Sequence, residues 1–312
     1  GTNSTAPNSM APKSMAMVID LQSSGLNAMS ASDARQYFDK LGQDIDAMRD
    51  RGIEVTWATM GENQRLITPD HDQAARPLND GELKAAYFLD HEHPDRPVAV
   101  DQERLGIFRG FLHKHGPRTD EAVHVKFFKS AFMETSDFNH DADATQALSH
   151  EYGGLAGIAE QATAGGTMRA YMQEKAPDEV LVMGGMADHC VAENAIGVRQ
   201  HLGAKATVLC DNVLSWAEGN THGMTQQPTA VRWRDGTSDG QAADAWHQEN
   251  VQAGIDHAIT RPPPLGLSAE TAATVKSGIS FTNTDQALAA HPPNHTHRVN
   301  GQASDGADPF IS

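Results

Sequence analysis

The sequence contains only two cysteines among its 312 residues, Cys190 and Cys210, and no CxxC pair. A zinc site built from cysteines is therefore not expected, and a chain of this length can bury a sizeable core without disulfides. Two thiols fit a reducing, cytoplasmic compartment most simply. The first seven residues also lack the cationic start and apolar core that mark a secretory signal.

Basic residues and long apolar runs are scarce as well. The 24 Lys and Arg residues stand against 41 Asp and Glu, which gives a formal net charge of −17. This charge argues against nucleic acid and against an anionic membrane surface as partners. No apolar run approaches the roughly 18 residues that a membrane-spanning helix needs. The acidic balance itself indicates nothing further about partners, since it also serves solubility.

Continuous apolar runs alternate along the chain with segments of helical periodicity. The predicted strands cover residues 15–20, 53–58, 122–128, 180–184 and 205–210. The predicted helices cover residues 32–51, 82–89, 101–115, 145–175, 188–201 and 242–259. Strands that alternate with helices predict a Rossmann-like, three-layer α/β/α fold with a parallel doubly wound sheet.

The domain limits follow from composition. We expect one α/β domain over residues 15–261, preceded by a flexible segment at 1–14. Polar, irregular stretches near 61–120 and 139–178 read as insertions, which often form lids or oligomer contacts at a sheet edge. Residues 262–312 begin with three prolines and end in Gly, Asp and Asn, so we expect a partly irregular C-terminal arm.

Cys190 is the side chain with the clearest chemical potential. It follows a predicted strand and a glycine turn, and it lies in the first turn of a predicted helix. The positive end of the helix dipole lowers the pKa of a thiol placed there and makes it a nucleophile. The alternative is a buried structural cysteine, which is the role expected of Cys210.

Two further side chains are expected beside Cys190. Asp20 follows the first predicted strand, and Lys126 lies toward the end of the third. Ligands of a parallel sheet bind beyond the carboxyl ends of its strands. A carboxylate, an amine and a thiol are therefore expected at one edge of the sheet.

Three sequence blocks extend this pattern: VIDLQ at 18–22, KFFKSAF at 126–132 and GGMADHCV at 184–191. In this order and on these elements, they resemble the isochorismatase-like cysteine hydrolase superfamily. The resemblance spans most of residues 15–215 and implies the fold of that superfamily, in an oligomer that is a dimer or a tetramer.

The resemblance implies a catalytic triad of Asp20, Lys126 and Cys190. Asp20 would take the proton of the thiol and later return it to the leaving amine. Lys126 would stabilise the thiolate and keep Asp20 ionised. The thiolate would attack a carbonyl carbon and form a thioester, which water then hydrolyses.

The same resemblance implies further residues of the site. The backbone N–H groups of Ala187 and Cys190 would form the oxyanion hole, and the Met186–Ala187 peptide bond would be cis. Four residues are candidates for contact with the substrate, although aromatic residues at such positions are more often core and His189 can simply begin a helix. They are Gln22, Trp57, Phe132 and His189.

The sequence departs from the superfamily's nicotinamidases, which carry an Asp-x-His metal pair after the second strand. Residues 56–61 read TWATMG and lack that pair. His71, His91 and His93 follow, but His-x-His in a polar loop is more often solvated than a ligand set. We therefore expect no metal and no other cofactor, and nicotinamide is not the favoured substrate.

These patterns favour a cysteine hydrolase that cleaves a C–N bond of a small amide or ureido compound. One alternative is an isochorismatase-type vinyl-ether hydrolase, which needs the acid and the lysine but not the thiol. Another is a binding or effector protein built on a hydrolase scaffold.

Overall fold

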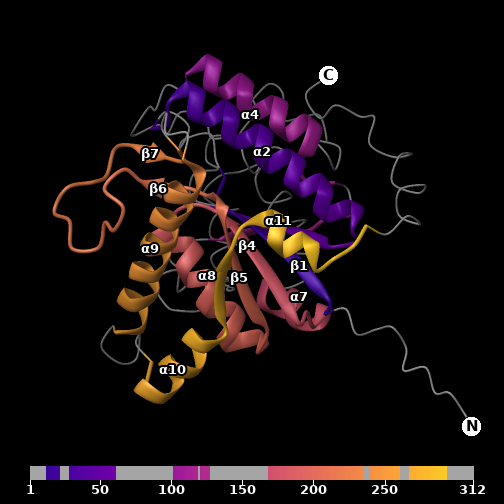
Figure 1. Cartoon of the computed structure of the whole chain (residues 1–312), viewed down its shortest axis with the longest axis vertical. Helices are drawn as coiled ribbons and strands as arrows, with labels where there is room; N and C mark the ends of the chain where they lie inside the picture. Colours follow the sequence, from indigo (N-terminus) through magenta and orange to yellow (C-terminus); the bar gives the residue numbers. More distant parts are fainter. Residues whose placement is uncertain are drawn as a thin grey trace, which may run out of the picture.

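A computed structural model of the chain describes residues 12–21, 28–60, 101–118, 120–126, 168–234, 239–260 and 267–293. These residues form a six-stranded sheet in the order β3-β2-β1-β4-β5-β8, in which every neighbouring pair is parallel. Helices cover both faces of the sheet (Figure 1). The predicted three-layer α/β/α fold with a parallel doubly wound sheet is therefore confirmed.

The central strands are buried on both faces. The sheet is built from β1 Ser14–Ile19, β2 Glu54–Met60, β3 Val123–Lys126, β4 Glu179–Gly184, β5 Lys205–Val213 and β8 Ile279–Thr282. In β1, Ala16 and Val18 join one core cluster, whereas Met15, Met17 and Ile19 join the other. Alternate side chains of a strand point to opposite faces, so a fully covered strand has to be apolar throughout.

Two helices pack together over one face of the sheet, α2 Ala31–Asp50 and α4 Gln102–His115. Ser30 caps α2 by accepting a hydrogen bond from the Asp33 N–H at 3.0 Å. A stripe of fully buried side chains runs along α2, formed by Tyr37, Leu41, Ile45 and Met48. Its spacing of three or four residues keeps these side chains on one side of the helix.

The opposite face carries a longer set of helices. They are α7 Met168–Lys175, the π-helical η4 Ala187–Val191, α8 Ala192–Gly197, the π-helical η5 Val198–Leu202, α9 Gly240–Ile259 and α10 Ala269–Ser277. A two-stranded antiparallel ribbon, β6 Ser215–Trp216 with β7 Val231–Arg232, follows the end of β5. In the part of the chain described, no helix is long and apolar enough to cross a bilayer.

The C-terminal region departs from the expected irregular arm. Residues 267–293 form α10, β8 and α11 Thr284–Ala289, and β8 adds a sixth strand alongside β5. The sheet therefore continues past residue 261, the predicted end of the α/β domain. All four residues of β8 are only half-buried, so the strand has no continuous apolar run to reveal it in the sequence.

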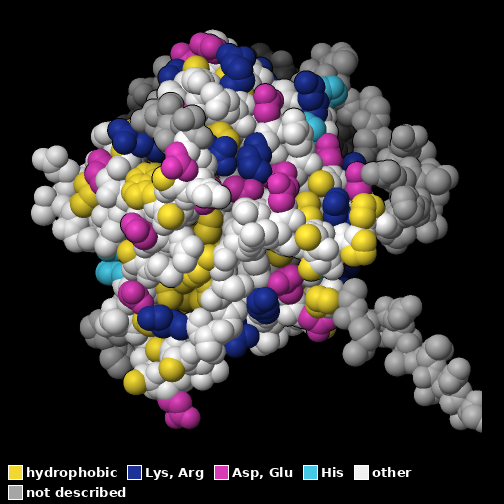
Figure 2. All heavy atoms as spheres, viewed as in Figure 1, with side chains coloured by type: hydrophobic (Ala, Val, Ile, Leu, Met, Phe, Trp, Pro, Cys, Tyr) yellow, Lys and Arg dark blue, Asp and Glu magenta, His cyan; other side chains and the backbone are white. Residues whose placement is uncertain are grey.

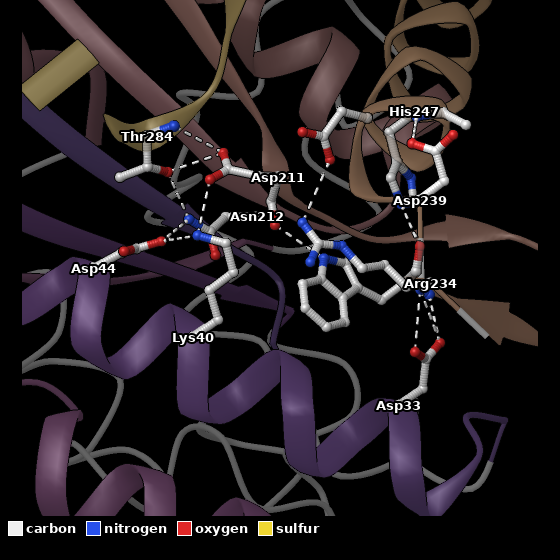
Figure 3. Close-up of polar contacts among 12 residues, drawn as sticks. Asp33, Lys40, Asp44, Asp211, Asn212, Arg234, Asp239, His247 and Thr284 are labelled. Atoms are coloured by element: carbon white, nitrogen blue, oxygen red, sulfur yellow. Dashed lines mark hydrogen bonds and ion pairs between the residues drawn. The ribbon is translucent and has the colours of Figure 1, made fainter. Parts of the chain in front are cut away.

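Polar side chains at the end of β5 hold the start of α11 in place (Figure 3). One oxygen of Asp211 accepts hydrogen bonds from the Thr284 N–H and hydroxyl, both at 2.9 Å. The other oxygen pairs with Lys40 of α2 at 2.8 Å. Asn212 donates to the Thr284 hydroxyl at 2.8 Å. This network ties α2, β5 and α11 to one another.

The predicted insertions fall mostly outside the described residues. Within the predicted insertion limits, α4 and α7 are regular helices, whereas residues 61–100 and 127–167 are not described. On the face shown in Figure 2, acidic and basic side chains of the described residues are interspersed rather than gathered by sign. That face therefore offers no continuous basic surface to nucleic acid.

Candidate active site

The centre of the sheet is the place where its strand order reverses, because β1 lies between β2 and β4. Open α/β sheets bind their ligands at such a switch point, beyond the carboxyl ends of the strands. Ile19 pairs with Gly184 at the last register position of β1 and β4. The Gly185 N–H donates to the Ile19 carbonyl at 3.0 Å, which joins the two strand ends.

Asp20 is the first residue beyond β1. Its φ of 51° lies in the left-handed region, which few residues other than glycine adopt and which Asp tolerates better than most. Its N–H donates to the Ala58 carbonyl of β2 at 2.9 Å. The chain therefore turns sharply at Asp20 while its backbone stays anchored to the sheet.

Gly184 closes β4 in a conformation that requires glycine. Its φ is 111°, and a Cβ added there would lie 2.1 Å from the Ile19 carbonyl oxygen. Any side chain would force β1 and β4 apart at their ends. Gly184 is the first glycine of the GGMADHCV block. The backbone of Ile19, the residue before Asp20, approaches it too closely for any other residue.

Cys190 lies in η4, the first turn of the helical segment that follows β4. Cys190 is 7% exposed. Neither Cys190 nor Cys210 is part of a disulfide, so both side chains are free thiols. A π-helical turn within a helix is uncommon and often occurs at functional sites. The segment ends at Gly203 with a φ of 62°, the left-handed conformation in which glycine commonly closes a helix.

Helix α9 packs closely against η4. A Cβ on Gly254 of α9 would lie 2.4 Å from the carbonyl oxygen of Asp188. Glycine at this position lets the two backbones touch, so α9 supports the turn that presents Cys190.

Two backbone predictions for this turn are wrong. The cis peptide bond joins Gly185 and Met186, one residue before the predicted Met186–Ala187 bond. The sequence has no proline here that would mark the position of the bond. The Ala187 N–H donates to the Leu214 carbonyl at 2.8 Å, so it is not available to an oxyanion. Leu214 follows β5, which runs to Val213 rather than ending at Cys210 as predicted.

The Met186 N–H is another backbone donor in this turn, which the sequence interpretation did not consider. It directly precedes Ala187 in the turn. Unlike the Ala187 N–H, it has no hydrogen-bond partner among the described residues. It is therefore the better candidate for a donor to a developing oxyanion beside Cys190.

Lys126 is the last residue of β3, where it pairs in register with Met60 of β2. The backbone of Lys126 thus lies at the same carboxyl edge of the sheet as Asp20, two strands away from β1. The side chain of Lys126 is outside the described part, and so are Gln22 and Phe132.

Trp57 does not line a pocket, contrary to the sequence prediction. Its side chain is fully buried in the core beneath α2 and α4, and its indole N–H donates to Glu121 at 3.1 Å. Strand periodicity places Trp57 on one face of the sheet but does not say what covers that face.

His189 belongs to a polar cluster that the sequence did not reveal. Its Nε2 lies 2.8 Å from the Thr221 hydroxyl, and its ring centroid is 4.3 Å from that of His222. The rings of His222 and His257 stack at 3.7 Å. Thr221 and His222 follow β6 and lie more than thirty positions away from His189, so no local sequence pattern connects them.

Cys210 has the structural role predicted for it. Burial, together with the nearby carboxylates of Asp244 and Asp211, raises the pKa of this thiol to about 12. A thiol in this environment stays protonated and unreactive. Cys210 therefore serves as a natural internal control for the reactivity of Cys190.

Comparison of the sequence with protein-family models and with curated proteins gives no match. Several solved structures have similar chain traces. An isochorismatase-like hydrolase from Alkaliphilus metalliredigens has 15% identity and a TM-score of 0.40, over 89% of this chain and 98% of that one. The pyrazinamidase of Pyrococcus horikoshii in complex with zinc has 12% identity and a TM-score of 0.37, over 87% of this chain and 99% of that one. An isochorismatase family protein from Burkholderia thailandensis has 14% identity and a TM-score of 0.38, over 89% of this chain and 95% of that one. Similarity at this level does not assign a function, which has to be argued from the residues of this chain.

Proposed function

We propose that this protein is an isochorismatase-like cysteine hydrolase that cleaves a C–N bond of a small amide or ureido compound. The observation that carries the proposal is the pairing of β1 with β4 at Ile19 and Gly184. Because these strand ends are neighbours, the residue after β1 and the turn after β4 share the switch point of the sheet. The first is Asp20, and the second leads to Cys190.

The proposed chemistry begins with proton transfer from the Cys190 thiol to the Asp20 carboxylate. The thiolate then attacks the carbonyl carbon of the substrate, and the oxyanion that forms accepts a hydrogen bond from the Met186 N–H. When the tetrahedral intermediate collapses, the C–N bond breaks and Asp20 gives its proton to the leaving nitrogen. The acyl group remains on sulfur as a thioester.

Hydrolysis of the thioester completes the cycle. Asp20, again a carboxylate, takes a proton from water as the water oxygen attacks the thioester carbonyl. The C–S bond breaks, the carboxylic acid leaves, and the proton held by Asp20 returns to the thiolate. Lys126, whose backbone ends β3 at this sheet edge, is proposed to favour the charged forms of both partners through its positive charge.

A thiol in the first turn after β4 favours this reaction over the hydrolysis of a vinyl ether, which needs water but no nucleophile from the protein. The alternative of a catalytically inactive scaffold is tested by the reactivity of Cys190. At a pH well below about 8.5, the pKa of an ordinary thiol, iodoacetamide should alkylate Cys190 and leave Cys210 intact. Equal, slow labelling of both thiols would support the scaffold.

Activity is tested with a panel of small amides and ureido compounds, with ammonia release as the measurement. The Cys190→Ala variant should lose turnover, whereas Cys210→Ala should keep it. Mass spectrometry of the intact wild type during turnover should detect the acyl adduct, which Cys190→Ala should not form. Full activity of Cys190→Ala would exclude the thioester mechanism.

A further inference from the structure

The side chains of Asp188, His189 and His222 gather beside the turn that carries Cys190. One potential ligand atom from each lies within 4.8 Å of the other two. The His189 Nε2 is 3.4 Å from the Asp188 Oδ2. Two ligand atoms bound at about 2.1 Å to a tetrahedral metal ion lie about 3.4 Å apart, so this pair already has the required separation.

The carboxylate of Asp188 is held firmly but is not fully satisfied. Its Oδ2 accepts hydrogen bonds from the Thr221 N–H at 2.8 Å and from the Thr221 hydroxyl at 2.7 Å. Its Oδ1 is buried and has no hydrogen-bond partner among the described residues. The side chain has no solvent exposure. A buried carboxylate with one oxygen lacking a donor is costly, and a cation bound to the carboxylate would compensate its charge.

His222 is oriented as imidazole ligands usually are. Its Nε2 lies 2.7 Å from the backbone carbonyl oxygen of Asp188, so this nitrogen carries the proton and donates it. In metal sites, the second nitrogen of a ligating histidine typically donates to a carbonyl or a carboxylate in this way. The stacked ring of His257, inclined by only 11°, further restricts rotation of the His222 ring.

His189 completes the set. The single hydroxyl hydrogen of Thr221 goes to the Asp188 carboxylate, so the His189 Nε2 must donate to the Thr221 oxygen. On metal binding the His189 ring would lose this proton and its hydrogen bond to Thr221, and Nε2 would turn toward the Asp188 carboxylate. The Thr221 bonds to Asp188 would remain and would orient the carboxylate from behind.

We propose that Asp188, His189 and His222 bind one divalent first-row transition-metal ion, with Zn²⁺ as the best match. Two imidazole nitrogens and one carboxylate oxygen suit Zn²⁺ and disfavour Mg²⁺ and Ca²⁺, which prefer oxygen ligands. Three protein ligands leave a fourth position open for water or substrate. Because metal binding is measured without substrate, the site can be tested whether or not the proposed hydrolase activity holds.

The test is calorimetric titration of the chelator-treated full chain with Zn²⁺, with the metal content measured by mass spectrometry after dialysis. Wild type should bind one Zn²⁺ per chain, and excess Mg²⁺ should not compete. His222→Gln should weaken that binding by about 100-fold. The matched control is His115→Gln in α4, which removes a histidine that contacts Asp46 at 2.7 Å on the opposite face of the sheet. This variant should bind Zn²⁺ like wild type.

A second control addresses His91 and His93, which lie outside the described residues. The double variant His91→Gln, His93→Gln should keep the stoichiometric site. If His222→Gln does not fold, as judged by circular dichroism, His189→Gln replaces it with the same expected loss. Wild type without stoichiometric Zn²⁺, or ligand variants that bind Zn²⁺ like wild type, would overturn the proposal.

Discussion

Protonation of His247 should set much of the acid sensitivity of this protein. The imidazole has no solvent exposure and lies in α9, above the ribbon of β6 and β7 (Figure 3). Its Nε2 is 2.8 Å from the Trp233 carbonyl oxygen, to which it donates, and its Nδ1 is 2.7 Å from the Ser215 hydroxyl. The neutral ring therefore satisfies both nitrogens, whereas a protonated ring would lose the hydrogen bond from Ser215.

Burial lowers the pKa of His247 from 6.5 to about 4, although the hydrogen bond to Trp233 opposes the shift. Below pH 6.5 the unfolded chain binds a proton at His247 that the folded protein does not bind until the pH approaches 4. The unfolded state then holds more protons, so stability falls as the pH falls through this window. At about 1.4 kcal/mol per pKa unit, the loss between pH 7.5 and 5 is about 2 kcal/mol.

The measurement is urea unfolding of wild type and His247→Gln at both pH values. The variant lacks the titrating ring, so its free energy of unfolding should fall by about 2 kcal/mol less than that of wild type on acidification. The half-buried His201, whose pKa burial also lowers to about 4, is present in both proteins and cancels in the comparison. An identical pH dependence in the two proteins would refute the reasoning, whatever their difference at pH 7.5.

Two further perturbations test the packing around the site. Gly254→Ala should destabilise the protein by about 1–3 kcal/mol in urea unfolding, because the new Cβ overlaps the backbone of η4. Gly110→Ala in α4, where a Cβ meets nothing within 4 Å, should instead stabilise by about 0.4–1 kcal/mol; equal effects would contradict the packing argument. Arg49→Met should cost about 3–5 kcal/mol, because it removes the guanidinium that lies 2.6 Å from the buried Glu121 carboxylate and so leaves that negative charge uncompensated, although the hydrogen bond from Trp57 remains. Glu121→Leu in the Arg49→Met background should restore much of that loss, and a thermal melt that shows no recovery would argue against the charge explanation.

The parts of the fold that local patterns determine could be predicted from the sequence. The apolar runs of β1 and β4 gave strand limits within one residue of those observed, because strands covered on both faces need apolar side chains at every position. The buried stripe of α2 and the glycine stop at Gly203 are local for the same reason. The positions of Asp20 and Cys190 after β1 and β4 followed from these strands.

The features that could not be predicted depend on segments far apart in the sequence. β8 is short and half-buried, and its place is set by pairing with β5. The Ala187 N–H was predicted to bind an oxyanion, but it donates to the carbonyl of Leu214, which follows β5 and lies far from Ala187 in the sequence. The cluster of Asp188 and His189 with His222 likewise forms only when the loop after β6 folds back onto η4. A pattern within one segment contains no information about such partners.

The place of β8 in the sheet also has a consequence for synthesis of the protein. β5 is made directly after β4, but its other neighbour, residues 279–282, leaves the ribosome only after α9 and α10. Until then the nascent chain presents the N–H and C=O groups of residues 206–209 along an unpaired strand edge, which can recruit strands from other chains. This edge therefore stays open to such pairing from the synthesis of β5 until β8 has been made.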